Sequence, residues 1–242
     1  MEVHDGFIVG VFNYCDRWCE ACAFTSRCRL FADVAECDAA LDPNLVAVVD
    51  APPLPQEVPT SPPRWSQEEI DEMNAASLAP LSSEELRQLR RDVAPEHEPI
   101  QALAHGYCEK VHAWLRDRQS WETPDPADPR AVIGWFHTLI PSKVVRALKA
   151  LAWDEPELRD WPPDHDGSAK VALLGIERSH AAWLQIVERG LASTREVDEF
   201  IADLVWLGKE IERVFPNARA FVRPAFDEPD EIARLLACEA RL

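Results

Sequence analysis

The spacing of apolar residues along most of the chain predicts a set of amphipathic helices. Apolar residues recur every three or four positions over 98–118, 129–152, 168–190 and 193–214, which is the repeat of one helix face. In the segment 168–190 they cover more than half of the helix circumference, so this helix is expected to be the most buried. Helices of this length joined by short connections predict an all-α, up-and-down bundle of four to five main helices.

Shorter elements are predicted around these helices. Capping residues open a short helix over 81–93, and a last short helix ends the chain. Strand signals are confined to 6–13 and 45–50, which we expect to pair as a small two-stranded ribbon. Pro141 lies inside the second long helix and is expected to kink or split it, because proline has no N–H to donate to the preceding turn.

The prolines divide the chain into parts. Seven of them lie between Pro43 and Pro63, which predicts an extended linker over residues 41–65. This linker separates a cysteine-rich module, residues 1–40, from a helical bundle with a C-terminal strap and helix, residues 66–242. We expect few contacts between the module and the bundle, so that the bundle folds without the module.

Composition and charge narrow the class of protein. Nine tryptophans and nine phenylalanines exclude a chain that is disordered throughout. The formal net charge of −18 repels a phosphate backbone, so nucleic acid is not expected as a partner, whereas a protein partner or an electron-transfer partner is compatible with it. No apolar run approaches the length of a membrane span, and no secretory signal is recognised, so a cytoplasmic location is expected.

Four of the seven cysteines lie within one short segment, with the spacing C-x3-C-x2-C-x5-C. They are Cys15, Cys19, Cys22 and Cys28. Since cytosolic proteins rarely keep disulfides, four close thiols indicate a metal centre. Thiolates are soft ligands, and four of them suit either an iron–sulfur cluster or a tetrahedral zinc. The dense opening of the motif favours the cluster over zinc; a redox-active disulfide pair or a set of accidentally buried cysteines would also fit the spacing.

The segment CEACAFTSRC resembles the C-x2-C-x-F-x3-C segment of iron–sulfur nucleases of the CRISPR-associated and recombination type. The resemblance covers residues 19–28 and implies that Cys19, Cys22 and Cys28 are cluster ligands. The carboxylate-plus-lysine pattern of a nuclease active site is not found in the sequence, so nuclease activity is not carried over. The longer string YCDRWCEACAFTSRC also resembles uncharacterised bacterial helical proteins, which implies no function.

Two Glu-x-x-His pairs offer a second metal site in the bundle: Glu109 with His112, and Glu177 with His180. Together with the cysteine segment they resemble rubrerythrins, which implies a di-iron centre supplied with electrons from the cysteine site. Helical phase opposes this interpretation. Glu109 is expected to face solvent and His180 to lie on the apolar face of its helix, while the intervening helix offers His137 and no inward glutamate.

The sequence therefore predicts a metal-binding helical protein whose cysteine centre is structural or redox-sensing and whose bundle binds a partner. An oxidoreductase that passes electrons from the cysteines to the bundle site is the second hypothesis. The sequence defines no catalytic nucleophile. Arg219, Arg223 and Asp227 are expected to tie the C-terminal strap to the bundle. The isolated Cys37, Cys108 and Cys238 are expected to be small buried apolar residues.

Overall fold

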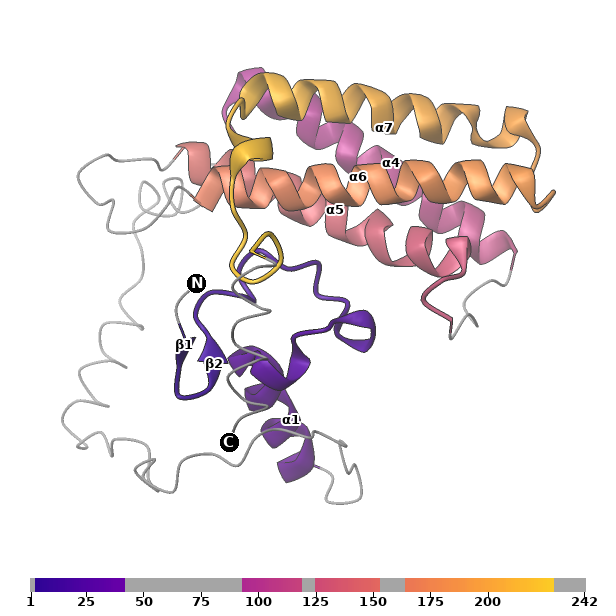
Figure 1. Cartoon of the computed structure of the whole chain (residues 1–242). Coiled ribbons are helices and arrows are strands. Elements are labelled where there is room, and N and C mark those ends of the chain that lie inside the picture. Colours follow the sequence, from indigo (N-terminus) through magenta and orange to yellow (C-terminus); the bar gives the residue numbers. More distant parts are fainter. Residues whose placement is uncertain (1–2, 42–92, 119–124, 153–163, 229–242) are drawn as a thin grey trace, which may run out of the picture. The chain divides into compact units, whose positions relative to one another are not determined.

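A computed structural model of the protein describes residues 3–41, 93–118, 125–152 and 164–228 (Figure 1). Four long helices dominate this part of the chain. They are α4 (Glu98–Asp117), α5 (Pro129–Ala152), α6 (Asp164–Glu188) and α7 (Thr194–Val214). Their bounds lie within a few residues of the ranges that the apolar spacing predicts.

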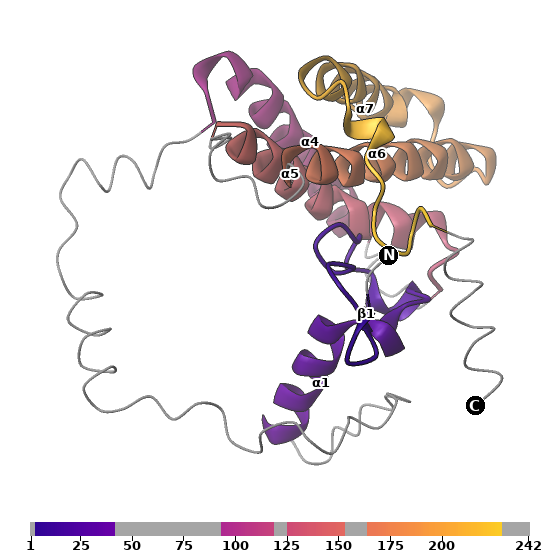
Figure 2. The same cartoon turned by 60° about the vertical axis from the view of Figure 1, so that its left-hand side comes forward.

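Each of these helices packs against two others, so that the four form a closed bundle. α4 contacts α5 and α7, and α6 contacts the same two helices. Consecutive helices run in opposite directions, as both views show (Figures 1 and 2). The prediction of an all-α, up-and-down bundle is confirmed for the described residues. None of the helices in those residues has both the length and the apolarity needed to cross a membrane.

An aromatic cluster forms the centre of the bundle. The Trp183 ring from α6 lies 4.9 Å from the Trp114 ring and stacks at 4.6 Å on Phe200 of α7, measured between ring centroids. Its indole Nε1 donates a hydrogen bond of 3.1 Å to the hydroxyl of Tyr107, which is fully buried. A buried indole N–H without an acceptor is costly. This hydrogen bond therefore removes that cost for Trp183 of α6, which is buried beside Tyr107 of α4.

Helix α5 continues without a break through Pro141, which corrects the prediction that the proline could split it. A proline removes one backbone hydrogen bond of the helix. Ile140 and Val144, on either side of it, are almost completely buried in the core. Each buried aliphatic side chain contributes about 1.5–3 kcal/mol, which is comparable with the cost of about 3 kcal/mol of a proline inside a helix.

The N-terminal segment begins with a short hairpin. Strand β1 (Val3–His4) pairs antiparallel with β2 (Phe7–Ile8). Asp5 and Gly6 form the turn with φ values of +51° and +81°, as a two-residue type I′ turn requires. The strand signal near residue 7 thus pairs with the residues just before it. The other predicted strand, 45–50, lies outside the described residues.

After the hairpin, two 3₁₀ turns, Cys19–Ala21 and Thr25–Arg27, lead into helix α1 (Arg29–Leu41). We call residues 12–28 the cysteine loop. All the described residues belong to one compact unit of the chain. The predicted linker beyond Leu41, most of the predicted helix 81–93 and the predicted C-terminal helix lie outside the described residues.

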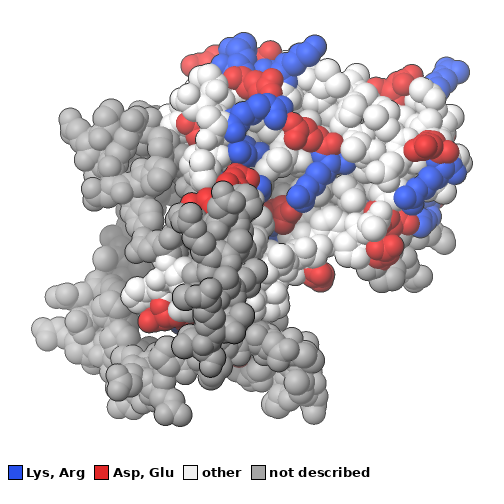
Figure 3. Space-filling model, viewed as in Figure 1, with Lys and Arg blue, Asp and Glu red and all other residues white. Residues whose placement is uncertain are grey.

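The surface of the described part carries charges of both signs. On the face shown in Figure 3, acidic and basic side chains are interspersed over the bundle. Ion pairs account for part of this pattern, for example Lys110 Nζ, which lies 2.7 Å from a carboxylate oxygen of Glu199 and 2.5 Å from one of Asp203. These contacts also link α4 to α7.

Candidate functional site

The four cysteines of the predicted metal centre line one small cavity. Cys15 is buried and Cys19, Cys22 and Cys28 are half-buried, and all four are free thiols. The cavity has a volume of about 20 Å³. Aromatic side chains make up much of its wall: Phe12, Trp18, Phe24, Phe31 and Phe226. The local fold therefore brings together residues that span fourteen positions of the sequence.

Local turns direct these thiols toward the cavity. The two 3₁₀ turns reverse the chain between the second, third and fourth cysteines. Arg17 has a φ of +59°, a left-handed conformation that is costly for a residue with a Cβ and that occurs between Cys15 and Cys19. The backbone N–H of Phe24 donates a hydrogen bond of 3.4 Å to Cys22 Sγ, a contact that stabilises a thiolate.

The electrostatics of the thiols show that they are close neighbours. Burial raises the pKa of the Cys19 thiol, and the proximity of Cys15, Cys22 and Cys28 raises that pKa further, because neighbouring thiolates repel. Burial also raises the pKa of Cys22, although its hydrogen bond from Phe24 acts in the opposite direction. A bound cation would reverse this repulsion and favour the thiolates.

The thiols nevertheless do not converge as the ligands of one ion do. Within the described residues, no three or more His, Cys, Asp or Glu side chains form a group that could hold a metal ion. The Cys15 thiol donates a hydrogen bond of 3.4 Å to the carbonyl oxygen of Phe12, which it would give up as a ligand. The structure thus gathers the four cysteines around one cavity without placing them at ligand distances.

The second set of predicted ligands is only partly brought together. Glu109 and His112 are exposed on α4, as helical phase predicts. Glu177 is exposed and pairs with Arg219, with 2.6 Å between its carboxylate and the guanidinium. His180 is half-buried, whereas the adjacent Ser179 is completely buried. The prediction that His180 lies in the core is therefore wrong.

His137 is the buried member of this set. Its ring is 2% exposed and lies 5.8 Å from the ring of His112 across α4 and α5, measured between centroids. Nδ1 is 2.7 Å from the carbonyl oxygen of Gly134, and Nε2 has no hydrogen-bond partner in the described part of the chain. Burial lowers the pKa of His137. The rings of His137 and His112 lie close together, whereas Glu177 is paired with Arg219, so these residues do not form a common site across the helices.

Asp16 connects the cysteine loop to the bundle, and the sequence did not single it out. Its backbone oxygen accepts a hydrogen bond of 2.7 Å from Trp135 Nε1, and its carboxylate lies 2.6 Å from Arg178 Nη1. Trp18 stacks on Trp135 at 5.7 Å, with 15° between the ring planes. We expected few contacts between the module and the bundle, and the structure has several. The sequence feature that could have indicated these contacts is the presence of Asp16 and Trp18 between Cys15 and Cys19.

The described part of the C-terminal strap, residues 220–228, contacts both the bundle and the cysteine loop. Lys170 of α6 donates to the carbonyl oxygen of Phe221 at 2.8 Å and lies 3.2 Å from the Asp227 carboxylate. The Phe226 ring lies 4.9 Å from Phe24 of the loop, measured between centroids. Just before the strap, Arg219 pairs with Glu177. The expectation that charged residues tie the strap to the bundle is confirmed for Arg219 and Asp227.

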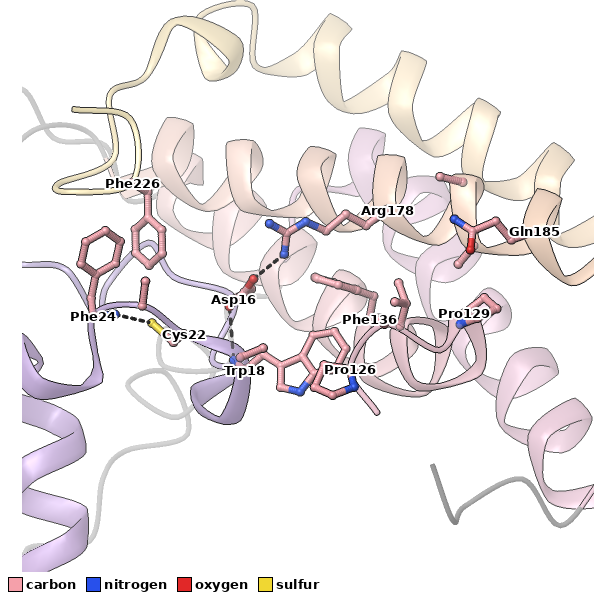
Figure 4. Close-up of a pocket in the computed structure, with 16 residues that line it drawn as sticks. Asp16, Trp18, Cys22, Phe24, Pro126, Pro129, Phe136, Arg178, Gln185 and Phe226 are labelled. Carbon is pink, nitrogen blue, oxygen red and sulfur yellow. Dashed lines mark hydrogen bonds and ion pairs between the residues drawn. The ribbon is translucent and has the colours of Figure 1, made fainter. Parts of the chain in front are cut away.

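A larger cleft of about 500 Å³ lies beside the cysteine cavity (Figure 4). The cysteine loop, α5, α6 and the strap all contribute to its walls. The cleft and the cavity share Asp16, Trp18, Cys22, Phe24 and Phe226. Anything bound in the cleft therefore lies against a wall that contains one of the four thiols.

The isolated cysteines do not belong to either space. Cys37 is exposed on α1, which corrects the expectation of a buried residue, and Cys108 is half-buried on α4. Cys238 lies outside the described residues.

A comparison with known proteins finds no matching family model, no similar curated protein and no similar solved structure.

Proposed function

We propose that the protein is a metal-binding protein whose centre is held by Cys15, Cys19, Cys22 and Cys28. One observation carries the proposal: four free cysteine side chains line the same aromatic-walled cavity. Four thiolates are the ligand set of structural zinc and of iron–sulfur clusters. Binding requires the thiols to lose their protons and move inward by small rotations of their side chains.

Two metals fit this ligand set, and a different observation favours each. The spacing C-x3-C-x2-C is typical of an iron–sulfur cluster, and the N–H of Phe24 directed at Cys22 Sγ is the kind of contact that tunes such a cluster. The cavity of about 20 Å³ is instead the size of a single ion or water molecule and favours zinc. The cluster is our first proposal and zinc the second.

A structural role for the centre follows from the small apolar core around it. The buried apolar cluster that the N-terminal segment forms with the strap contains only Ile8, Val11 and Ala225 among the described residues. Small modules with so few buried side chains usually need a metal or disulfides to be stable. With an iron–sulfur cluster, the same centre would also respond to oxidants.

Metal analysis of the purified protein tests the proposal. Anaerobic purification followed by iron, acid-labile sulfide and zinc determination is expected to give either a brown protein with iron and sulfide or a colourless protein with one zinc per chain. Replacing Cys19 or Cys22 by Ser is expected to remove most of the metal. Cys37→Ser and Cys108→Ser are the matched controls and are expected to retain it, because neither residue lines the cavity.

Two results would contradict the proposal. A folded wild-type protein that contains neither metal after anaerobic purification excludes the centre. Equal metal loss in the Cys22→Ser and Cys108→Ser proteins would show that the metal is held by thiols in general and not by this cavity.

A further inference from the structure

The cleft beside the cysteine cavity is not used by the proposed metal centre. Its volume of about 500 Å³ lies within the range of about 300–1,000 Å³ that is usual for small-molecule sites. In Figure 4, Phe24 and Phe226 lie at one end and Pro129 and Gln185 at the other, with Arg178 between them. The cleft therefore presents several kinds of group to one ligand.

The apolar walls of the cleft suit a flat ring system. Trp18 and Phe24 line it from the loop, Phe136 from α5 and Phe226 from the strap. The rings lie in two contacting pairs, Trp18 with Phe136 and Phe24 with Phe226, and small side chains such as Ala181 on α6 complete the lining. A planar molecule can pack against the small residues and meet the edges or free faces of these rings.

The polar groups of the cleft favour hydrogen-bond acceptors over charged groups. Arg178 is neutralised by Asp16, since Nη1 lies 2.6 Å from the carboxylate, and a guanidinium has further N–H groups to donate. The Gln185 side-chain oxygen accepts from Arg189 at 3.4 Å, so its amide nitrogen can donate into the cleft. The two charges on the wall cancel, and the whole chain carries −18, so an anionic ligand gains little.

We propose that the cleft binds an uncharged, planar, aromatic carbonyl compound, the chemical class of the quinones and of the flavin ring. The ligand's ring system packs against the contacting pair of Trp18 and Phe136 on the side that Trp135 does not cover, and Arg178 and Gln185 donate hydrogen bonds to its carbonyl oxygens. The ligand then lies against Cys22. The binding itself does not depend on the proposed metal centre, because none of these contacts involves a metal.

Lumichrome is a suitable probe, because it is planar, uncharged, fluorescent and rich in carbonyl acceptors. Titration of the full-length protein into lumichrome is expected to change the fluorescence with one site per chain. Gln185→Leu removes one donor and is expected to weaken binding about five- to tenfold. Ala181→Trp fills the cleft from an exposed position of α6 and is expected to abolish binding.

Ala202→Trp is the matched control, since Ala202 is an exposed alanine of α7 that does not line the cleft. It is expected to bind lumichrome as the wild type does. Absence of binding to the wild type, or equal binding to the Ala181→Trp and wild-type proteins, would overturn the inference. Flavin mononucleotide adds a phosphate to the same ring system. Binding of this anion at least tenfold more tightly than lumichrome would show that the cleft recognises the phosphate and would overturn the proposed ligand class.

Discussion

His137 illustrates how a single buried base makes stability depend on pH. In the folded chain its pKa is lowered from 6.5, first by burial, with the nearby His112 acting in the same direction. The unfolded chain therefore takes up a proton at a higher pH than the folded chain does. The stability associated with neutral His137 is fully present above about pH 6.5 and is lost as the pH falls toward the lower folded pKa.

Replacing His137 by Gln is expected to reduce this pH dependence. Thermal melts of the wild type between about pH 7 and pH 5 should show a falling Tm, and the fall should be smaller in His137→Gln by about 2 °C or more. His105→Gln, on the exposed face of α4, is the control and should leave the slope unchanged. Parallel slopes in the wild-type and His137→Gln proteins would contradict the assignment.

Asp227 in the strap adds a second pH dependence at lower pH. Burial alone would raise its pKa, but the hydrogen bonds from Arg223 and Lys170 outweigh burial and place the pKa at about 2. Its stabilising ion pairs are therefore present above the ordinary value of 3.8 and are lost as the pH falls toward about 2. The window between pH 7 and pH 5 thus reports on His137 and not on this carboxylate.

At the scale of the helices, two glycines show opposite consequences of the same substitution. A methyl group added at Gly106 of α4 meets no atom within 4 Å, whereas one added at Gly167 of α6 would lie 2.2 Å from the Tyr14 ring and 2.9 Å from Phe221. Both lie inside helices, where alanine is intrinsically better than glycine. The difference in stability between the two alanine variants therefore reports how closely the cysteine loop and the strap approach α6.

Gly106→Ala is expected to stabilise the protein by about 0.5–1 kcal/mol, because it removes backbone freedom from the unfolded chain. Gly167→Ala is expected to destabilise it by about 1–3 kcal/mol, because the Tyr14 ring must move. Chemical denaturation of the two variants measures both changes in the free energy of unfolding, an increase for Gly106→Ala and a decrease for Gly167→Ala. Stabilisation by Gly167→Ala would mean that Tyr14 does not pack against α6.

The helices were predictable from the sequence because a helix face that is buried along its whole length places an apolar residue at every third or fourth position. The orientation of His180 could not be predicted in this way. Leu184 is apolar but 51% exposed, so including it among the apolar residues of 168–190 turns the predicted face of α6 toward His180 and away from the buried Ser179. The contact of Asp16 with Trp135 was also missed, because it joins residues far apart in the sequence and leaves no repeating pattern.

At the scale of the whole molecule, the contacts between the cysteine segment and the rest of the chain determine whether the segment can be detached from the bundle. We expected a module that leaves the bundle readily. Asp16, Trp18 and Tyr14 instead contact Trp135, Arg178 and Phe221. The spacing of the cysteines predicted that they lie close together, and they line one cavity. The neighbouring cleft could not be predicted, because α5, α6 and the strap supply much of its wall.

A protein with a specific protease site inserted after residue 57 tests whether the cysteine segment stays bound to the helical bundle once the chain is cut. After cleavage, the N-terminal fragment is expected to co-elute with the helical fragment in gel filtration and to separate from it only in denaturant. Trp135→Ala removes both the stacking on Trp18 and the hydrogen bond to Asp16, and it should release the fragment. Separate elution of the wild-type fragments would restore the picture of an independent module.

The bond from Trp135 to Asp16 also limits what protein engineering can do with the cysteine segment. Asp16 directly follows the first cysteine, and its backbone and side chain are both held by residues of the helical body. A synthetic peptide comprising residues 1–41 would keep every thiol of the motif but lose this support. If the four cysteines hold a metal as proposed, the peptide would fold around it with a larger loss of chain entropy and bind it more weakly. Grafted onto another protein, the segment would need a tryptophan and an arginine of the host to hold Asp16 in the same way.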